Sequence, residues 1–467
     1  GKTAVFGLAC LQKLDLALDH RGGRPQALVL SPTRELATQL VASIRGLATG
    51  MPGVRVLAVT GGSPSRDQRA RLEAGAHVVV ATPGRCLQLL ELGNLDPRFV
   101  STLVLDEADT LLDMGFEEEV NRILKFLPPQ RQTLLFSATW ADRVEGLSKR
   151  LQRNPKIVSD GQAAGEQGQA TKSVAAQVDP SLLKQSALLF KGGQETRLEA
   201  LCHVLATADA EANGSNTASG EQGGEGSCVV FCETRIQCKE VAEALVSRGA
   251  SALALHGELE QNDREKTLVR FRNKSCRILV ATNVASRGLD VEGVSLVVCF
   301  ELNDDPAVHI HRVGRTARAE SKGTAVSLVC VGSGGKTEQR NEHGAEGARL
   351  DAIDAALGGH PMTRISWTPP SNDVSGRGMR DSQLEGWAAE WHTVLVLGGR
   401  RDKLRPGDVL GALSGSDVGL QGNQVGKIEV TEQRTWVAVR RAVAAKAAQA
   451  LDVTKIKKRR FKAHLIR

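Results

Sequence analysis

The sequence predicts an α/β protein made of two tandem domains with parallel sheets, followed by a small α+β domain. Short apolar runs alternate with segments of helical periodicity over residues 4–158, and a second such series follows a Gly- and Gln-rich linker at 159–172. Continuous apolar strands separated by helices are typical of a parallel sheet covered on both faces. The region 393–467 predicts the order β-α-β-β-α-β, which is typical of an RRM-like domain.

Length and composition exclude several classes of protein. The 467 residues suffice for roughly two to four domains of ordinary size. Apolar residues make up 41% and charged residues 24%, which excludes collagen-like and wholly disordered chains. No stretch comes near the roughly 20 uninterrupted apolar residues that a membrane span needs. The nine cysteines include no CxxC pair, so we expect buried free thiols rather than disulfides or a zinc site.

Five apolar runs form the first predicted sheet. Each run is followed by a turn signal and then by a segment with helical spacing. The predicted strands are 27–30, 56–59, 78–81, 102–105 and 133–136. We assign residues 1–158 to this first domain.

A second series of strands and helices begins after the linker. Its predicted strands are 228–231, 252–255, 278–280, 296–299 and 325–329. The Gly-, Ser- and Glu-rich segment 207–227 predicts a disordered insertion, and 332–347 has a similar composition. We assign 173–364 to the second domain and 365–392 to a connector.

The third predicted domain, 393–467, is short and strongly basic. Its expected strands are 393–397, 425–430, 434–439 and 460–466, and its expected helices are 406–413 and 442–451. It holds 16 Lys and Arg against 6 Asp and Glu, whereas the rest of the chain holds 44 against 47. A net charge of +10 concentrated in one module predicts that the module binds a polyanion.

Two separated motifs indicate nucleotide chemistry. The chain begins Gly1-Lys2-Thr3, the end of a phosphate-binding loop, in which a lysine supplies a point charge and a hydroxyl binds Mg²⁺. A later apolar strand ends in Asp106 and Glu107, and open parallel sheets bind ligands at the carboxyl ends of strands. Asp106 can hold Mg²⁺, and Glu107 can orient or deprotonate the attacking water. Taken alone, these acids could simply cap the following helix, but their pairing with Lys2 and Thr3 favours catalysis.

The sequences and the order of further motifs resemble those of the DEAD-box RNA helicases. Asp106-Glu107-Ala108-Asp109 is followed by Ser137-Ala138-Thr139, and other matching segments run in the family's order over about 320 residues. These segments are 32–36, 61–62, 82–85, 230–234, Gln261 with Arg264, 281–290 and 311–318. The resemblance implies two RecA-like domains, ATP and Mg²⁺ as cofactors, and RNA as the substrate.

The resemblance also implies roles for individual residues. Nucleotide binding is implied for Gly1, Lys2, Thr3 and Asp290, with Thr3 and Asp106 as ligands of Mg²⁺. Catalysis is implied for Asp106, Glu107, Arg315 and Arg318, the two arginines reaching the γ-phosphate from the second domain. Coupling of hydrolysis to RNA binding is implied for Ser137, Ala138 and Thr139. RNA contacts are implied for Pro32, Thr33, Arg34, Gly61, Gly62, Thr82, Pro83, Gly84, Arg85, Gln261, Arg264, Thr282 and Gly288.

The chain departs from the family's pattern at three places. Asn283 stands where many members have Asp, and it keeps a hydrogen-bonding oxygen without the charge. Ala317 stands where most members have Gly, and we expect activity to survive the added methyl group. The family's adenine-recognising glutamine motif and the first half of its phosphate loop would precede Gly1, so we expect a truncated N-terminus.

The third domain resembles the RNA-binding domain of bacterial DEAD-box helicases of the DbpA type, on the strength of 405–413, 425–428 and 436–440. An ordinary RRM stacks bases on aromatic side chains of its two central strands. Here the predicted first strand has none, and the third has only Trp436, which we expect in the core. We therefore expect contacts to phosphates and RNA shape, made by a basic cluster. This cluster is Lys455, Lys457, Lys458, Arg459, Arg460 and Lys462.

Together these features predict an RNA-stimulated ATPase that locally unwinds or remodels RNA. The resemblance of the tail implies large-subunit ribosomal RNA and pre-ribosomal particles as partners, and ribosome assembly as the process. We expect a monomer in the cytoplasm, or in the plastid stroma if the source is eukaryotic. The alternatives are an ATP-independent RNA-binding or annealing protein, if the fragment is the natural chain, and a DNA helicase on the same fold. The motifs at 106–109 and 137–139 and the RRM-like tail favour RNA.

Overall fold

The chain folds into two compact units: the first consists mainly of residues 1–177, and the second holds most of the remaining chain, up to its C-terminus. The computed structural model describes residues 2–18, 21–62, 65–140, 142–158, 182–214, 226–283, 293–317, 322–331, 344–357, 360–369, 384–415 and 418–466. No helix in these ranges is long and apolar enough to span a membrane.

The first unit is a five-stranded parallel sheet in the order β2-β3-β1-β4-β5. Its strands are β1 (Ala27–Leu30), β2 (Val56–Val59), β3 (Val78–Ala81), β4 (Thr102–Leu105) and β5 (Gln132–Leu135). Its helices are α1 (Lys2–Gln12), α2 (Arg34–Leu47), α3 (Ser65–Glu73), α4 (Pro83–Glu91), α5 (Ala108–Asp113), α6 (Glu117–Phe126) and α7 (Asp142–Leu151). All five predicted strands are present, the last of them shifted by one residue.

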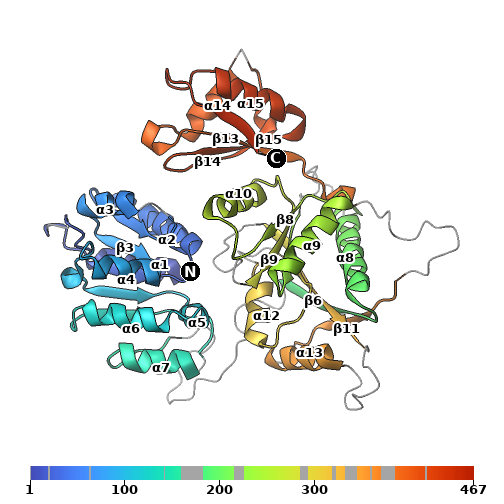
Figure 1. The fold of residues 1–467 in the computed structure, drawn as a ribbon, viewed down its shortest axis with the longest axis horizontal. Coiled ribbons are helices and arrows are strands. Elements are labelled where there is room, and N and C mark those ends of the chain that lie inside the picture. The colour runs from blue at the N-terminus through green and yellow to red at the C-terminus, as the bar shows by residue number, and fades with distance from the viewer. Residues whose placement is uncertain are drawn as a thin grey trace. The chain divides into compact units, whose positions relative to one another are not determined.

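Helices cover both faces of this sheet (Figure 1). Along β1, Leu28 and Leu30 point into a core with α3 to α7, whereas Ala27 and Val29 point into a second core with α1 and α2. Side chains of a strand alternate between faces, so a strand buried on both faces has no polar positions. The uninterrupted apolar runs of the sequence follow from this double burial.

The second unit contains a seven-stranded sheet in the order β12-β6-β11-β10-β7-β9-β8, with every neighbouring pair parallel. Its strands are β6 (Leu183–Phe190), β7 (Ser227–Cys232), β8 (Ala252–Leu255), β9 (Ile278–Thr282), β10 (Val294–Cys299), β11 (Gly323–Cys330) and β12 (Thr363–Ser366). Its helices are α8 (Gln194–Gly214), α9 (Arg235–Ser247), α10 (Gln261–Arg272), α12 (Pro306–Val313) and α13 (Gly344–Ala356). The two RecA-like domains expected from the sequence are thus both present as parallel sheets.

Four expectations about the second domain need correction. The predicted strands omitted β6 and β12, and β12 crosses the boundary that we placed at residue 364. Helix α8 continues to Gly214, so the expected insertion at 207–227 overlaps a helix, and only 215–225 lie outside the described residues. Likewise α13 begins at Gly344, inside the second Gly-rich stretch. Composition averaged over a window hid the Ala-rich helical end of α8.

Part of the expected connector belongs to the core of the second domain. Leu384 and Trp387 are buried against α8 and α9, and the indole Nε1 of Trp387 donates a hydrogen bond of 2.9 Å to the carbonyl of Leu205. The connector assignment rested on scattered polar residues, and local composition does not reveal a single aromatic anchor that packs 182 residues away in sequence.

The C-terminal domain has the predicted order β-α-β-β-α-β. Its strands are β13 (Trp391–Val396), β14 (Val425–Val430), β15 (Thr435–Arg440) and β16 (Ala463–Ile466), and its helices are α14 (Pro406–Ser414) and α15 (Ala444–Val453). The sheet is antiparallel in the order β14-β15-β13-β16. Both helices pack on one face, around Val394, Val396, Val437 and Val439. The first strand starts two residues before the predicted boundary and therefore includes Trp391.

Candidate functional site

The strand order of the first sheet separates two groups of predicted site residues. In a parallel sheet the carboxyl ends of all strands lie along one edge, where ligands bind. The neighbouring strands β2, β3 and β1 lead into 61–62, 82–85 and 32–34, the predicted RNA contacts. The other two strands, β4 and β5, lead into Asp106 with Glu107 and into Ser137. One edge thus carries the predicted RNA contacts after three adjacent strands and the predicted hydrolysis residues after the next two.

Asp106 has the environment of a cation ligand. Its side chain is 7% exposed, and burial, followed by the adjacent charge of Glu107, raises its pKa to about 7, whereas the charge of Lys2 opposes the rise. Desolvation disfavours the charged carboxylate, and a bound divalent cation would compensate for the lost hydration. The buried carboxylate, with the hydroxyl of Thr3, fits an ion held mainly by nucleotide phosphates, as Mg²⁺ usually is.

Glu107 is held in a strained backbone conformation. Its φ of 49° and ψ of 57° are left-handed, which is uncommon for a residue with a side chain. It precedes α5, yet its carboxylate makes no capping hydrogen bond. The simple capping role considered from the sequence therefore does not apply to Glu107. Strained residues of this kind cluster at functional sites.

Asp109 connects the motif at 106–109 to the motif at 137–139. Its Oδ2 accepts hydrogen bonds from the backbone N–H of Ala138 (3.1 Å) and from the N–H and hydroxyl of Thr139 (2.9 and 3.1 Å). The backbone N–H of Asp109 donates to Oγ of Ser137 (3.3 Å), and Nζ of Lys2 donates to the carbonyl of Ser137 (3.2 Å). The sequence places Asp109 in a motif but gives it no role, because its partners lie about 30 residues away and only the β4–β5 pairing brings them close.

Arg34 and the Gly61–Gly62 pair, all predicted RNA contacts, form one surface at the edge of the sheet. Gly62 has a φ of +76°, and a Cβ added there would collide with Nη1 of Arg34. Thr33 caps α2, since its Oγ1 accepts a hydrogen bond from the N–H of Leu36 (3.2 Å). The two glycines thus leave room for the guanidinium beside bare backbone, an arrangement suited to a phosphate.

The third predicted RNA segment lies at the start of α4. Thr82 occupies the N-cap position without a side-chain capping bond, and Pro83 follows at the first helical position. Nε of Arg85 donates to Oε1 of Gln68 (3.1 Å), and Gln68 donates in turn to the carbonyl of Thr60 (2.7 Å). This chain of bonds joins the segments that follow β2 and β3. Nη2 of Arg85 is buried and has no hydrogen-bond partner among the described residues.

Arg312 is the centre of the second domain's motifs. Its side chain is 2% exposed and donates to Oδ1 of Asn283 (2.7 Å), the carbonyl of Glu301 (2.6 Å) and Oε1 of Glu233 (2.5 Å). Its guanidinium lies 5.6 Å from the ring centroid of Phe231. The side chain therefore connects segments 230–234, 281–290 and 311–318, and the sequence interpretation gave it no separate role.

The other predicted residues of the second domain are only partly described. Nε of Arg315 donates to the carbonyl of His311 (3.3 Å), and Thr282 ends β9. Gln261 and Arg264 lie in the first turn of α10. Ala317 has a left-handed φ of 51°, which explains why glycine is favoured at this position. Outside the described residues lie Gly1, Gly288, Asp290 and Arg318.

The basic cluster of the C-terminal domain is a structured loop. Its six predicted residues are all exposed, whereas Ile456 and Phe461 anchor the loop in the core. Lys457 and Lys458 have φ values of 50° and 67° in a two-residue turn closed by hydrogen bonds between Ile456 and Arg459 (2.8 and 3.0 Å). Such a turn normally takes Asn-Gly, so two lysines here are held at a cost in strain.

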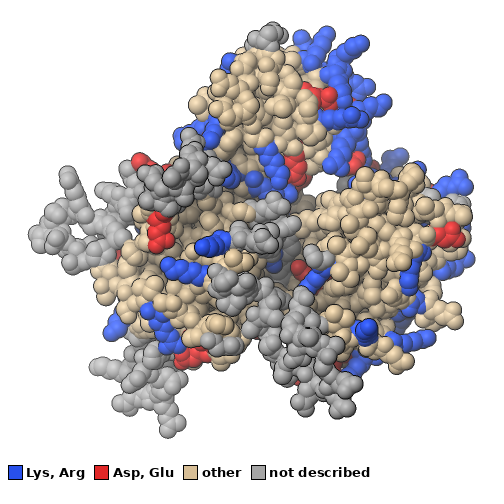
Figure 2. Space-filling model, turned by 180° about the vertical axis from the view of Figure 1, so that it is seen from behind, with Lys and Arg blue, Asp and Glu red and all other residues tan. Residues whose placement is uncertain are grey.

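A second basic loop, missed from the sequence, joins the predicted cluster. Nζ of Lys457 donates to the carbonyl of Lys403 (2.8 Å) and lies 2.7 Å from Oδ2 of Asp408. Lys403 has a left-handed φ of 62°, and Arg400, Arg401 and Lys403 belong to the same loop. Figure 2 shows Lys and Arg side chains gathered along one side of this domain. We call the loops 400–405 and 455–462 together the basic loop pair.

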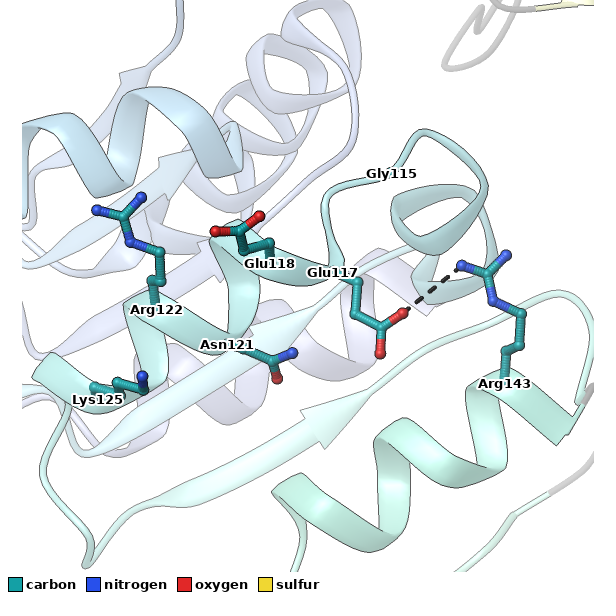
Figure 3. A pocket seen from close by; sticks show the side chains of 7 residues that line it. All are labelled: Gly115, Glu117, Glu118, Asn121, Arg122, Lys125 and Arg143. Atoms are coloured by element: carbon teal, nitrogen blue, oxygen red, sulfur yellow. Dashed lines mark ion pairs between the residues drawn. The ribbon is translucent and has the colours of Figure 1, made fainter.

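The first domain also has a surface hollow away from these residues. It has a volume of about 660 Å³ and lies between α6 and the start of α7 (Figure 3). Oε2 of Glu117 and Nη2 of Arg143 lie 3.7 Å apart across it. None of the predicted site residues lines the hollow, and we assign it no function.

Comparisons with known proteins agree with this arrangement. Residues 1–147 match the DEAD/DEAH box helicase family, 198–320 the helicase conserved C-terminal domain, and 393–465 the DbpA RNA binding domain. The chain is 40% identical to the ATP-dependent RNA helicase DbpA of Escherichia coli (strain K12), over 100% of this chain and 89% of that protein. It is 30% identical to the ATP-dependent RNA helicase DbpA of Bacillus subtilis (strain 168), over 94% and 84%. The solved structure of S. cerevisiae Dbp5 bound to RNA and ADP BeF3 has a TM-score of 0.62 and 27% identity, over 78% of this chain and 83% of that one.

Proposed function

The chain belongs to the DEAD-box ATP-dependent RNA helicases of the DbpA type, and from that premise we propose that it remodels large-subunit ribosomal RNA during ribosome assembly. Family membership establishes ATP hydrolysis as the energy source and RNA as the substrate. The choice of ribosomal RNA, the use of Mg²⁺ and the cellular process are the proposal. Two observations disfavour an ATP-independent annealing protein. The chain belongs to a family of ATP-dependent helicases, and the buried carboxylate of Asp106 suits a bound cation.

In this proposal, each residue at the edge of the first sheet has a separate role in ATP hydrolysis. Thr3 and Asp106 would hold Mg²⁺, which neutralises charge on the phosphate oxygens. Lys2 supplies a positive charge to the phosphates, and Glu107 orients the attacking water. Asp109 holds the segment from Ser137 to Thr139 next to these residues through four hydrogen bonds. Arg315 and Arg318, carried by the second domain, stabilise the charge that develops on the γ-phosphate.

One observation carries the choice of a folded RNA: the basic loop pair. The loops present exposed lysines and arginines, and three lysines are held in left-handed conformations by the surrounding fold. A rigid set of cations with little aromatic surface recognises phosphates at fixed positions, as in a folded RNA element, rather than unstacked bases. Within a DbpA-type helicase this supports docking on a structured ribosomal RNA element.

We also propose that the protein acts as a monomer in the cytoplasm. All nine cysteines are free and eight are buried, which suits a reducing compartment. Size-exclusion chromatography with light scattering would test the first part of this proposal, and a dimeric mass would contradict it.

The proposed substrate is tested by exchanging charge in the loop pair. Lys458, Arg459 and Arg460 are changed together to Glu, and Lys457 is kept because it pairs with Asp408. We expect ATPase stimulation by large-subunit ribosomal RNA to fall to the level given by a length-matched random duplex. The control changes three exposed basic residues elsewhere in the domain, Lys427, Arg441 and Lys446, to Glu. Equal preference for ribosomal RNA in the triple variant and the parent would contradict the proposal.

A further inference from the structure

The sheet face of the C-terminal domain that points away from α14 and α15 is covered along only part of its length. Leu395 and Trp436 lie on this face and form an apolar cluster with Val269 of α10. Trp436 is thus buried, as the sequence predicted, but against α10 rather than in the core of its own domain. Side chains alternate along a strand, so the same face continues along β13 to Trp391, which is only half-buried. The face therefore ends in an aromatic side chain that solvent reaches.

The sequence interpretation missed Trp391 because the predicted first strand began at Thr393. In the structure β13 begins at Trp391, directly opposite Arg440 of β15. Strands β13 and β15 are the first and third strands of the domain and lie in the middle of its sheet. An ordinary RRM carries its stacking side chains on these two strands. The pair therefore occupies strands that bind bases in this fold, at a part of the face that the cluster around Val269 does not include.

The guanidinium of Arg440 lies over the indole ring. Its central carbon is 4.3 Å from the centroid of the Trp391 ring. Nη1 of Arg440 also donates a hydrogen bond to Oε2 of Glu390, which holds the guanidinium in one orientation. The side chain of Arg440 is still 32% exposed. Unpaired RNA bases stack on arginine guanidinium planes as well as on aromatic rings, so the two side chains form an oriented stacking layer.

A glycine on the neighbouring strand β14 makes room for the indole. A Cβ added at Gly426 would lie 2.9 Å from Cζ3 of Trp391 and 3.1 Å from Cβ of Ala438. Gly426 does not have a left-handed φ, so its backbone conformation would accept other residues. The space explains the glycine: without a side chain at this position, the indole lies against the backbone of β14. The position of the ring is therefore set by the sheet beneath it and by Arg440.

We propose that Trp391 and Arg440 form a stacking site for an unpaired RNA base, separate from the basic loop pair. Strand β13 has six residues, so at about 3.3 Å per residue its two ends are roughly 17 Å apart. Both loops of the basic loop pair adjoin the end of β13 that is remote from Trp391, where β13 pairs with the start of β16. This inference rests on the proposed function: the basic loop pair holds a folded RNA element, and the stacking site holds an unpaired nucleotide that flanks it.

The stacking site is tested first with a short single-stranded oligoadenylate, so that the outcome does not depend on ribosomal RNA. The five tryptophans of the full chain are replaced by 5-fluorotryptophan, and their fluorine NMR signals are assigned with Trp391→Phe and Trp436→Phe. We expect the signal of Trp391 to shift saturably when the oligoadenylate is added, and the signal of the buried Trp436 to stay in place. An abasic oligomer of the same length is the control and leaves Trp391 unshifted. A Trp391 signal that does not move with excess oligoadenylate would overturn the proposal.

The contribution to affinity is measured with a hairpin of large-subunit ribosomal RNA, with and without a single-stranded extension. We expect the extension to raise the affinity of the parent about tenfold in fluorescence anisotropy, and an abasic extension to raise it little, because it keeps the phosphates and lacks the stacking surface. Trp391→Ala and Arg440→Ala should lose this gain and keep the parent's affinity for the bare hairpin. Lys446→Ala, an exposed basic residue on α15, is the control and keeps the gain.

A conservative variant separates stacking from charge. Arg440→Lys keeps the positive charge but not the planar guanidinium, so we expect it to lose most of the gain from the extension. Circular dichroism and the melting temperature of each variant verify that the C-terminal domain stays folded. A full gain in Arg440→Lys, or a hairpin that binds equally well with and without the extension, would overturn the stacking site alone. A hairpin that the parent does not bind would contradict the proposed function and leave the fluorine NMR result standing.

Discussion

At the scale of single residues, Glu107 combines strain with chemistry. A left-handed conformation costs a residue with a Cβ about 1–2 kcal/mol. No side-chain capping hydrogen bond of Glu107 to α5 offsets this cost. Glu107→Gln keeps the size of the side chain and removes the charge that, in our proposal, orients the attacking water. We expect RNA-stimulated ATP turnover to fall by about 10²-fold or more while ATP-dependent RNA binding persists. Glu118→Gln on α6 serves as the control, and turnover within a few-fold of the parent would remove Glu107 from this role.

Ala317 offers a stability test of the same backbone conformation. Its φ of 51° strains an alanine but not a glycine. We expect Ala317→Gly to raise the free energy of unfolding by about 1 kcal/mol, measured by urea titration. Ala254→Gly, on a strand without positive φ, should have the opposite sign. A loss of stability in Ala317→Gly would show that the conformation is not strained in the folded protein.

His309 makes the second domain sensitive to acid. Burial lowers the pKa of its imidazole to about 3, with the nearby charge of Arg312 as a second, smaller cause. In the unfolded chain this histidine binds a proton as the pH falls below about 6.5, whereas the buried imidazole of the folded protein stays neutral. Stability is therefore complete above about pH 6.5 and falls on acidification from there toward pH 3, by up to about 1.4 kcal/mol per pH unit. We expect His309→Gln to flatten this part of the unfolding free energy between about pH 7 and pH 5, and an unchanged slope would contradict the assignment.

At the scale of elements, Arg312 links α12 to the ends of β7 and β9 and explains how Asn283 is tolerated. Arg312 needs acceptors, and Glu233 supplies the negative charge that Asn283 lacks. Arg312→Lys cannot reproduce the planar set of donors, so we expect a loss of about 3–5 kcal/mol in unfolding free energy. Glu233→Gln should also destabilise, and Asn283→Asp in the same chain should recover part of the loss by returning a carboxylate. Glu240→Gln, exposed on α9, is the control, and absence of any recovery would place the charge balance elsewhere.

At the scale of the whole molecule, we expect the C-terminal domain to give the helicase its selectivity for RNA and a part of its stability. Deleting residues 388–467 should leave weak RNA-stimulated ATPase activity without preference for ribosomal RNA, since the remaining chain lacks the basic loop pair. The salt dependence of RNA affinity should become shallower, because fewer phosphates are neutralised. The same deletion should lower the melting temperature of the second domain, because it exposes Val269 to water. Selectivity equal to that of the parent would place RNA choice in the helicase domains.

The sequence by itself determined the three folded parts and located the motifs along them. Strands buried on both faces must be apolar throughout, so the strands of the parallel sheets can be recognised from local composition. The motifs at 106–109 and 137–139 can be recognised because each is a short run of consecutive residues. The concentration of positive charge in 393–467 is likewise a local property. The lysines of the predicted cluster could be found from the sequence alone, whereas their left-handed turn was seen only in the structure.

Only the tertiary structure decided which distant groups meet. Asp109 acquires its partners when β4 pairs with β5, Arg312 when β7 and β9 bring Glu233 and Asn283 to α12, and Trp436 when α10 lies on the sheet. The outcome for each of these side chains depends on a partner remote in sequence, and several partners were chemically possible for each. Periodicity reports which side of an element is buried, whereas the identity of what buries it is set by the packing of the complete fold.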